Sequence, residues 1–411
     1  DIFGDEYYAY QGFYEKAAEI AIYYGFQPIE TPVLEEENLF IAGVGEGTDI
    51  VDKEIYAFKT KSGDRIALRP EGTVSIMRAY FENGFQGQPQ PVMLYFYGPL
   101  FRHDKPQKGR YREFRQFDLE IIGTSKSIAD AMIIKLTLLT LEEAGLKNLK
   151  LDLNSIGDKE CRSEYRKELV NYYKKHIKDI CADCRERLKT NPLRLLDCKN
   201  PECQPIKNEA PNAISFLCSG CKAHFKELLE YLEMMNVTYE INHNLVRGLD
   251  YYSRTVFEIT NRDDGPEASS LAGGGRYDYL ARRLGSKKDT PAVGGAIGVD
   301  RVLQSTGAVM PHSRLLKKPK VFFIQLSFDA KLKSMQVIEV LRKAKVPIAQ
   351  SISKDSLAAQ LAIAERLKVP YTIILGQREA IENTVIVRNM TNRSQEVVPI
   401  KELGEYLKTL K

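Results

Sequence analysis

Apolar side chains at regular intervals predict a helix and then a hairpin in the first third of the chain. Residues 5–24 place apolar and aromatic side chains at helical spacing, which indicates an amphipathic helix. Residues 92–101 and 113–122 are rich in aromatic and β-branched residues and are typical of strands. The polar run between them contains Pro106 and Gly109, which interrupt any regular element, so we expect a hairpin with a long loop.

The same two periodicities predict further elements up to residue 305. Residues 26–34 are strand-like but contain Pro28 and Pro32, which a central strand does not tolerate well. This segment is therefore expected at a sheet edge or between subunits. The other predicted elements are a hairpin over 55–68, helices over 74–82, 128–144 and 280–284, and strands over 149–156, 239–245, 255–259 and 293–299.

Changes in composition along the chain suggest several domains. Residues 158–236 are polar, mostly helical in pattern and contain all seven cysteines, which is typical of an inserted helical subdomain. Residues 319–411 alternate strands with helices and predict a small α/β domain with a largely parallel sheet. The hairpins elsewhere favour an α+β body built on an antiparallel sheet flanked by helices. The expected divisions are a body in two parts (1–157 and 237–305), an insertion (158–236), a linker (306–318) and a C-terminal domain (319–411).

Composition narrows the class of protein. With 43% hydrophobic and 28% charged residues, the 411-residue chain has the balance of a soluble globular protein. No apolar run reaches the length of a membrane span, and the N-terminus has no signal-peptide pattern. Seven cysteines in so long a chain do not suggest a disulfide scaffold, so a cytoplasmic protein is expected.

Positive charge is concentrated at the C-terminal end. Residues 319–411 contain 15 Lys and Arg against 9 Asp and Glu, a net charge of +6, whereas the whole chain carries only +4. A basic domain on a nearly neutral body indicates a polyanionic partner, although the same charge could serve solubility alone.

The loop of the central hairpin is also basic, and it lies next to apolar strands. An arginine fork placed against a buried sheet suits bidentate recognition of phosphate or carboxylate. Phe114 and Phe117 offer faces on which a base could stack. On charge pattern alone, however, an exposed hairpin with a solvated basic tip is the simpler interpretation. The basic residues are Arg102, Lys105, Lys108, Arg110, Arg112 and Arg115.

Three further clusters combine glycine with charged residues. They are residues 68–73 (LRPEGT), 247–254 (RGLDYYSR) and 273–278 (GGGRYD), the last followed by 294–301 (GGAIGVDR). Glycine lets the backbone approach a ligand closely, and arginine supplies donors for phosphate, but each cluster by itself could be an ordinary turn. The sequence lacks a Walker A loop, a kinase-type glycine loop and a Rossmann fingerprint between a strand and a helix. Any nucleotide would therefore have to be bound by arginines on an antiparallel sheet.

Together these segments resemble the histidyl-tRNA synthetase family, in subclass IIa of the class II aminoacyl-tRNA synthetases, along essentially the whole chain. The RGLDYY segment is the most specific part of the resemblance, because the general class II motifs are degenerate. Residues 25–34 resemble motif 1, residues 101–104 with Phe114 resemble motif 2, residues 294–301 resemble motif 3, and residues 68–73, 245–252 and 274–278 are similar to segments peculiar to the histidine enzymes.

The resemblance implies an ATP-dependent ligase that forms histidyl-adenylate and transfers histidine to the 3′ end of tRNA(His), releasing AMP and pyrophosphate. Arg102 would hold the α-phosphate and Arg301 the γ-phosphate, while Phe114 and Arg301 would sandwich the adenine. Arg247 would neutralise charge that develops at phosphorus, so that Arg247 and Arg102 are the implied catalytic residues. Asp104 stands where the class usually has glutamate, and its shorter side chain could reach the adenine through water.

A histidine pocket is implied as well. Glu120 and Tyr252 would hydrogen-bond the two imidazole nitrogens, so any other side chain would leave buried polar groups unpaired. The remaining implied contacts are Glu71, Thr73 and Gln116 to the α-ammonium group, Arg247 to the carboxylate, and Tyr251 and Tyr277 as lining.

The partners implied by the resemblance are histidine, ATP with Mg²⁺, tRNA(His) and a second copy of the chain, bound through residues 25–34. The insertion would lie over the acceptor arm of the tRNA. The C-terminal domain resembles the anticodon-binding domain of class IIa enzymes, which would explain its charge. No membrane partner is expected.

The cysteines leave a metal site open. Three closely spaced pairs of them could supply four thiolates for a structural zinc ion. The family does not require zinc, and reduced cysteines can simply pack in a helical subdomain, so no metal site is the preferred interpretation and structural Zn²⁺ the alternative. The candidate ligands are Cys181, Cys184, Cys218 and Cys221.

Two other functions share many of these features. A regulatory, histidine-binding paralogue, a subunit of ATP phosphoribosyltransferase, would lack the C-terminal domain and typically lose the ATP-facing arginines. This chain has residues 319–411 and keeps Arg102, Arg247 and Arg301. A class IIa synthetase for another amino acid would share the motifs, and residues 247–252 argue for histidine instead.

Overall fold

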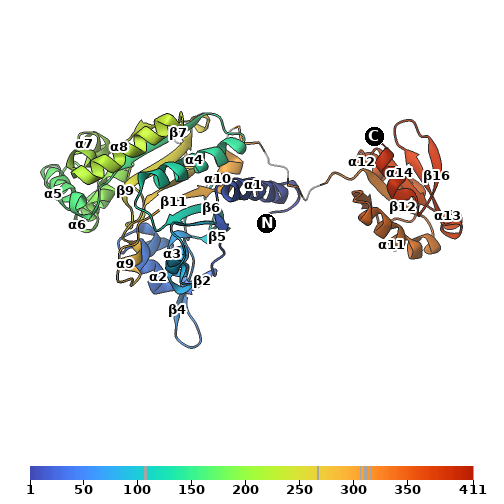
Figure 1. The fold of residues 1–411 in the computed structure, drawn as a ribbon, viewed down its shortest axis with the longest axis horizontal. Coiled ribbons are helices and arrows are strands. Elements are labelled where there is room, and N and C mark those ends of the chain that lie inside the picture. The colour runs from blue at the N-terminus through green and yellow to red at the C-terminus, as the bar shows by residue number, and fades with distance from the viewer. Residues whose placement is uncertain (106–108, 266–267, 306, 310–312, 315–316, 411) are drawn as a thin grey trace. The chain divides into compact units, whose positions relative to one another are not determined.

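Two structural units divide the chain, Asp1–Ser313 and Arg314–Lys411 (Figure 1). Pro106 and Lys108 of the predicted hairpin loop lie outside the described residues, as do parts of the predicted linker. The computed structural model describes residues 1–105, 109–265, 268–305, 307–309, 313–314 and 317–410.

An eight-stranded sheet forms the centre of the first unit (Figure 1). Its strands are β1 (Gln27–Pro28), β5 (Val92–Phe101), β6 (Glu113–Ile122), β7 (Leu149–Ser155), β8 (Glu240–Ile241), β9 (Ser253–Asn261), β10 (Ala272–Arg276) and β11 (Ala292–Gly298). They lie in the order β1-β5-β6-β11-β10-β9-β7-β8. Among these described strands, only the edge strands β1 and β8 pair in parallel with a neighbour. The antiparallel body is confirmed, and β5 and β6 have the predicted bounds.

Helices cover both faces of this sheet, and each face buries its own apolar core. One core receives α1 (Gly4–Tyr23), α4 (Ser127–Glu143), α8 (Ser219–Met234) and α10 (Val299–Gln304). The other receives α2 (Glu37–Val44), α3 (Thr73–Glu82) and α9 (Leu280–Arg283). Successive residues of β5 alternate between the two cores, as the pleat of a strand requires: Tyr95 joins the first core and Leu94 and Phe96 the second.

Residues 26–34 form much less strand than the sequence predicts. Only β1 pairs with β5, and the chain then leaves the large sheet and enters a three-stranded one of order β2-β4-β3. Prolines explain the interruption, because Pro32 has no N–H to donate. Buried Arg69 fixes the extended segment instead, by donating to the carbonyls of Thr31 and Pro99. The small sheet comprises β2 (Leu34–Glu36), β3 (Ala57–Lys59) and β4 (Arg65–Leu68).

The glycine-rich run that could have been a turn is strand β10, in the interior of the large sheet. It pairs antiparallel with both β9 and β11. Glycine has low strand propensity, but here the sheet has no room for side chains. A Cβ on Gly274 would lie 2.0 Å from the carbonyl oxygen of Gly294. Close packing between strands therefore overrides the local preference.

Residues 158–236 are mainly helical, as predicted. Their helices besides α8 are α5 (Lys159–Lys175), α6 (Ala182–Thr190) and α7 (Gln204–Asn208), with short 3₁₀ turns at Pro192–Asp197, Pro201–Cys203 and Ala213–Phe216. The segment has a small core of its own, yet Phe225 and Leu228 of α8 belong to the core of the large sheet. A buried ion pair joins the same elements. Asp130 of α4 accepts from Arg276 at 2.8 Å and lies 3.2 Å from His224 of α8.

The C-terminal unit is a mixed α/β fold around a five-stranded sheet of order β13-β12-β14-β15-β16. The first three strands are parallel, but β15 and β16 pair antiparallel, so the largely parallel prediction is only half right. None of the described helices of the chain is long and apolar enough to cross a membrane. The elements are β12 (Val321–Gln325), α11 (Phe328–Lys343), β13 (Ile348–Gln350), α12 (Leu357–Arg366), β14 (Tyr371–Leu375), α13 (Gln377–Glu382), β15 (Thr384–Asn389), β16 (Gln395–Pro399) and α14 (Leu403–Thr409).

Candidate active site

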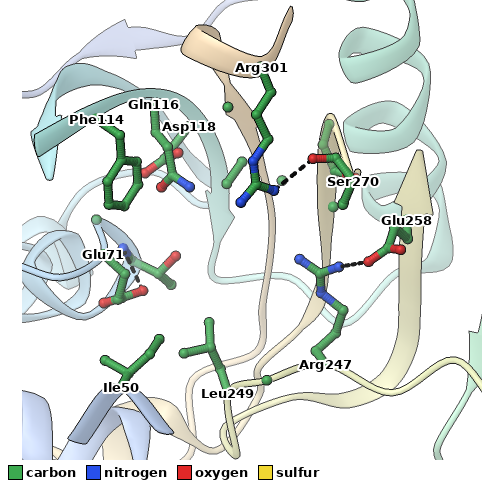
Figure 2. A pocket seen from close by; sticks show the side chains of 18 of the residues that line it. Ile50, Glu71, Phe114, Gln116, Asp118, Arg247, Leu249, Glu258, Ser270 and Arg301 are labelled. Atoms are coloured by element: carbon green, nitrogen blue, oxygen red, sulfur yellow. Dashed lines mark hydrogen bonds and ion pairs between the residues drawn. The ribbon is translucent and has the colours of Figure 1, made fainter. Parts of the chain in front are cut away.

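A pocket of about 280 Å³ lies on the face of the large sheet that carries α2 and α3. Figure 2 shows the guanidinium groups of Arg247 and Arg301 pointing into it from one side, with Phe114 and Glu71 across from them. The predicted site residues that line it are Glu71, Thr73, Arg102, Asp104, Phe114, Gln116, Arg247, Tyr251, Tyr252, Tyr277 and Arg301.

Strand β6 forms one wall of the pocket, because alternate side chains along part of it point into the cavity. Phe114, Gln116 and Asp118 line the cavity, whereas Phe117 and Leu119 point to the opposite face and join the core beneath α4. Alternate side chains along this strand therefore line the pocket, and the side chains between them pack in the apolar core. One face of the predicted hairpin thus faces the pocket, and its other face packs against the core.

Glycines in β10 and β11 make the space for the charged side chains. A Cβ on Gly273 would lie 2.5 Å from Nη1 of Arg247, and one on Gly294 would lie 1.6 Å from Oε2 of Glu120. A Cβ at either position would force the charged side chain beside it to move. These glycines keep the floor of the pocket at backbone level and leave room for the side chains of Arg247 and Glu120.

Positive charge is concentrated around one part of the cavity. Arg102, Arg110, Arg247 and Arg301 all line it. Burial, together with the positive charges of Arg110 and Arg102, lowers the pKa of the Arg301 guanidinium to about 10. Burial also lowers the pKa of Arg102, although Glu54 and Glu71 oppose the shift. Guanidinium groups held this closely repel one another, so an anion with several charges is the ligand that relieves the repulsion.

Specific contacts hold these arginines in place. Arg102 donates from Nε to the carbonyl of Pro70 at 2.9 Å, and its guanidinium carbon lies 5.3 Å from the ring centre of Phe114. Arg301 donates to the carbonyls of Gly109 at 3.1 Å and Ser270 at 2.8 Å. The two side chains are therefore positioned before any ligand binds.

Arg247 is held by one carboxylate and keeps donor capacity for a ligand. Its Nη1 donates to Glu258 at 2.6 Å (Figure 2). Burial tends to lower its pKa, but the charges of Tyr252 and Glu258 outweigh burial and raise it. Within the described residues, its buried Nε has no hydrogen-bond partner. A buried N–H without a partner is costly, so this group is suited to receive an incoming acceptor.

A second part of the pocket combines buried carboxylates with tyrosines. Glu71 accepts hydrogen bonds from the backbone N–H of Thr73 at 3.1 Å and Val74 at 2.7 Å, and from the Tyr251 hydroxyl at 3.0 Å. These bonds fix the carboxylate at the first turn of α3. Burial nevertheless raises the pKa of Glu71. A positively charged ligand group would restore the balance.

Glu120 lies behind this wall and does not line the cavity. Its two carboxylate oxygens accept from the Thr73 hydroxyl at 2.7 Å and from the Tyr277 hydroxyl. Burial raises the pKa of Glu120 to about 8, despite these hydrogen bonds. Thr73 and Tyr277, which bind Glu120 through their hydroxyls, line the pocket themselves, and so does Tyr252.

The segment 247–252 is anchored through Asp250. This carboxylate accepts from Arg162 of α5 at 3.3 Å and from Arg283 of α9 at 3.0 Å. Its backbone N–H donates to Val44 at the end of α2. Three elements distant in sequence thus hold the loop that presents Arg247 and both tyrosines.

Several pocket residues were not predicted from the sequence. Asp118, Glu258 and Asp300 line the cavity, and Asp300 accepts from the Tyr10 hydroxyl and from the backbone N–H of Arg115. Alternation along β6 from Gln116 could have indicated Asp118. Asp300 lies in the segment 294–301 that resembles motif 3, where no role was assigned to it, and it belongs to the first turn of α10. Glu258 depends on a pairing between distant strands, for which the local sequence contains no signal.

The proposed grouping of cysteines is wrong. Cys181 and Cys184 cluster with Cys198 and Cys203, whereas Cys218 and Cys221 cluster with Cys161 and Asp158. Each CxxC pair begins a different helix, α6 or α8, and the fold holds these two helix ends in separate places. The spacing identified the pairs correctly but could not show which pairs meet.

Comparisons with known proteins agree with this site. The family model described as histidyl-tRNA synthetase matches residues 1–302, and that of the anticodon binding domain matches residues 320–410. A histidine–tRNA ligase from Dehalococcoides mccartyi is 43% identical over 392 residues, covering 95% of this chain and 93% of the relative. The histidine–tRNA ligase from Thermodesulfovibrio yellowstonii is 40% identical over 410 residues, covering 99% and 96%.

Solved structures agree with the sequence comparisons. The chain matches the apo histidyl-tRNA synthetase from S. aureus with a TM-score of 0.81 and 30% identity, covering 100% of this chain and 98% of that one. A Bacillus halodurans protein described as an ATP phosphoribosyltransferase regulatory subunit/histidyl-tRNA synthetase shares the fold, with a TM-score of 0.63, 21% identity and coverage of 92% and 96%. The chain therefore belongs to the histidyl-tRNA synthetase family.

Proposed function

We propose that the protein is a histidine–tRNA ligase, which activates histidine with ATP and then esterifies tRNA(His). The observation that carries the proposal is the division of a single pocket. Four arginines lie around one part, and buried Glu71 and hydroxyl groups lie in the other. The first suits a triphosphate and the second an amino acid, so the two substrates would meet beside Arg247.

In the first step, a carboxylate oxygen of histidine attacks the α-phosphorus of ATP and pyrophosphate leaves. Arg102 and Arg247 would bind the α-phosphate, and Arg301 the γ-phosphate. Because these donors are fixed beforehand, they stabilise negative charge as it develops without reorganisation. Phe114 would stack on the adenine, and Asp104 would reach its amino group. Asp104 itself accepts a hydrogen bond from Arg110 at 3.0 Å.

The amino-acid end would select histidine by hydrogen bonding. Glu71, Thr73 and Gln116 would receive the α-ammonium group, and Tyr252 one imidazole nitrogen. Glu120 would act on the other nitrogen directly after a side-chain shift, or through the Tyr277 hydroxyl that it binds. A side chain without two ring nitrogens would leave these buried groups unpaired.

Magnesium would enter with ATP. Mg²⁺ prefers oxygen ligands and often keeps phosphates as its main ones. The pocket offers the carboxylate of Glu258 beside Arg247, which suits that chemistry. The metal would supply charge neutralisation of the phosphates, while the arginines do the positioning.

ATP–pyrophosphate exchange, run separately with each of the twenty amino acids, tests this function. Exchange with histidine alone would support both the reaction and the specificity. Exchange with another amino acid would reassign the enzyme within subclass IIa. No exchange, with histidine still bound by calorimetry, would favour the regulatory paralogue. The arginines that such a paralogue typically loses all line the pocket here, which argues against it.

We also infer a homodimer through residues 25–34, tRNA contacts by the insertion and the C-terminal unit, and a cytoplasmic location. Large apolar side chains are exposed around the dimer segment, which supports an interface there. They are Ile22, Tyr23, Tyr24, Val33 and Leu34. Sedimentation velocity tests the dimer, and a monomer at micromolar concentration would contradict it.

A further inference from the structure

All seven cysteines of the chain fall into two clusters outside the active site. In the first, one sulfur from each of Cys181, Cys184, Cys198 and Cys203 lies within 4.8 Å of the others. The Sγ atoms of Cys181 and Cys198 are 3.9 Å apart, as are those of Cys184 and Cys203. All four are free thiols, three of them buried.

These separations fit one particular arrangement. A zinc ion bound by four thiolates at about 2.3 Å places neighbouring sulfurs roughly 3.8 Å apart. A disulfide would need a separation of about 2 Å. Four thiols that merely filled a core would have no reason to converge on a common point, because a thiol packs as a small apolar group. The geometry therefore favours a tetrahedral ion over both alternatives.

A backbone N–H group near this cluster also donates a hydrogen bond to one of the sulfurs. Cys181 is the residue immediately before α6, and its N–H donates to Sγ of Cys203 at 3.2 Å. The start of α6 contributes Cys181 and Cys184, Cys198 directly follows the turn Pro192–Asp197, and Cys203 ends the turn Pro201–Cys203. An ion here would join three short elements that have only a small apolar core of their own.

The second cluster rests on separate observations. Cys161, Cys218 and Cys221 surround the Asp158 carboxylate, again with ligand atoms within 4.8 Å of one another. Asp158 caps α5 with Oδ1, and its Oδ2 lies 3.2 Å from Sγ of Cys221 and 3.7 Å from Sγ of Cys218. The N–H of Cys218 donates to Sγ of Cys161 at 3.0 Å. One carboxylate oxygen thus caps the helix, while the other lies close to the sulfurs of Cys218 and Cys221.

We propose that the insertion holds two structural zinc ions, one bound by Cys181, Cys184, Cys198 and Cys203, and one bound by Asp158, Cys161, Cys218 and Cys221. Both are donor sets that zinc accepts, and neither leaves an open position for catalysis. The first ion stabilises the interior of the insertion. The second joins the start of α5 to the start of α8, so it fastens the insertion where the chain leaves β7 and where it returns to the body.

Metal content of the purified full-length chain is the first test. We expect two zinc ions per chain, and thiols that react with a chromogenic disulfide reagent only after a chelator is added. A folded protein that activates histidine, contains no zinc, takes up neither Zn²⁺ nor Co²⁺ and has reactive thiols would overturn the proposal. Intramolecular disulfides in the native protein, detected by mass spectrometry, would overturn it as well.

Variants separate the two sites, and each serves as the matched control for the other. Cys198→Ser and Cys221→Ser should each reduce the zinc content from two ions to one. Co²⁺ replacing zinc should give intense thiolate-to-metal absorption, which each variant should lose in part. Loss of an ion in Cys198→Ser but no change in Cys221→Ser would support the first site and overturn the second, and the reverse result would do the opposite.

Failure of a variant to fold would not leave the question open. Stepwise chelation of the unaltered chain, followed by circular dichroism, reports whether zinc release accompanies loss of helix in the insertion. Histidine-dependent exchange on the same samples reports whether the body remains folded. Zinc release without any change in helix content or thermal stability would overturn the structural role.

Discussion

At the level of single residues, burial in the pocket shifts the pKa of several charged side chains. Burial and the positive charges of neighbouring guanidinium groups lower the pKa of Arg301. Burial raises the pKa of Glu71 and of Glu120. The charged form of each group is therefore less favourable in the pocket than it is in water. Substrate charges of the right sign would relieve both shifts, and this makes selectivity for an amino acid and a triphosphate a property of individual side chains.

Arg247→Ala should reduce histidine-dependent ATP–pyrophosphate exchange by roughly 10²–10³-fold, the usual cost of removing a donor to transition-state charge. The fold should remain, because the side chain contacts the pocket and Glu258 rather than a core. Thermal melting and exchange rates check both statements. Arg262→Ala, which removes an exposed arginine paired with Glu240, is the matched control and should exchange normally. Normal exchange by Arg247→Ala would exclude the assigned role.

Glu120→Gln should change how stability depends on pH. The folded carboxyl has a pKa of about 8, above its ordinary value of 4.5, so the folded state retains a proton that the unfolded state loses. The wild type should therefore lose stability relative to Glu120→Gln as pH rises from about 5 to 8, by roughly 1.4 kcal/mol per pH unit. Below pH 4.5 the difference should be constant.

Melting curves of both proteins across that pH range, without ligands, provide the measurement. Thr73→Val is a useful companion, because it removes one hydrogen bond to the same carboxylate without removing the charge. Parallel stability profiles for wild type and Glu120→Gln would mean that the Glu120 carboxyl titrates normally.

At the scale of elements, strands β10 and β11 show how a pocket can be made by omitting side chains. Gly273 has a backbone conformation open to alanine, but the added Cβ would meet the guanidinium of Arg247. Gly273→Ala should therefore melt at the same temperature as wild type or slightly higher, while exchange falls at least 10-fold. Gly87→Ala, whose Cβ would meet nothing within 4 Å, is the control. Wild-type exchange by Gly273→Ala would show that Arg247 can move without loss of function.

How well the sequence predicted each element depended on whether local pattern or distant packing decided it. The β5–β6 hairpin was predicted with correct bounds, because alternation and aromatic content are local signals. Strand β10 was missed, because its glycines are explained only by the neighbouring strand β11. The cysteine clusters were missed for the same reason, since Cys198 and Cys203 reach their partners through turns that spacing does not encode. The site residues came from family motifs, and period two along β6 would have added Asp118.

For the whole molecule, the division into two units predicts a division of activities. Each unit has its own apolar core, and the pocket is lined entirely by residues of the first. A protein ending at Ser313 should therefore keep histidine-dependent exchange within about 10-fold of the full chain. It should charge tRNA(His) at least 100-fold more slowly, because the basic C-terminal unit is missing. Equal losses in both assays would contradict separate roles, and the same assays on the full chain give the reference.

The arginine cluster has a further consequence for the direction of the reaction. In the proposed reaction its guanidinium groups bind the phosphates of ATP, and released pyrophosphate carries nearly the same charge pattern as that part of ATP. The groups that assist bond breaking therefore also assist the reverse attack of pyrophosphate on the adenylate. We expect activation by this enzyme to be readily reversible, so that net consumption of histidine depends on removal of pyrophosphate by another catalyst or on prompt transfer to tRNA.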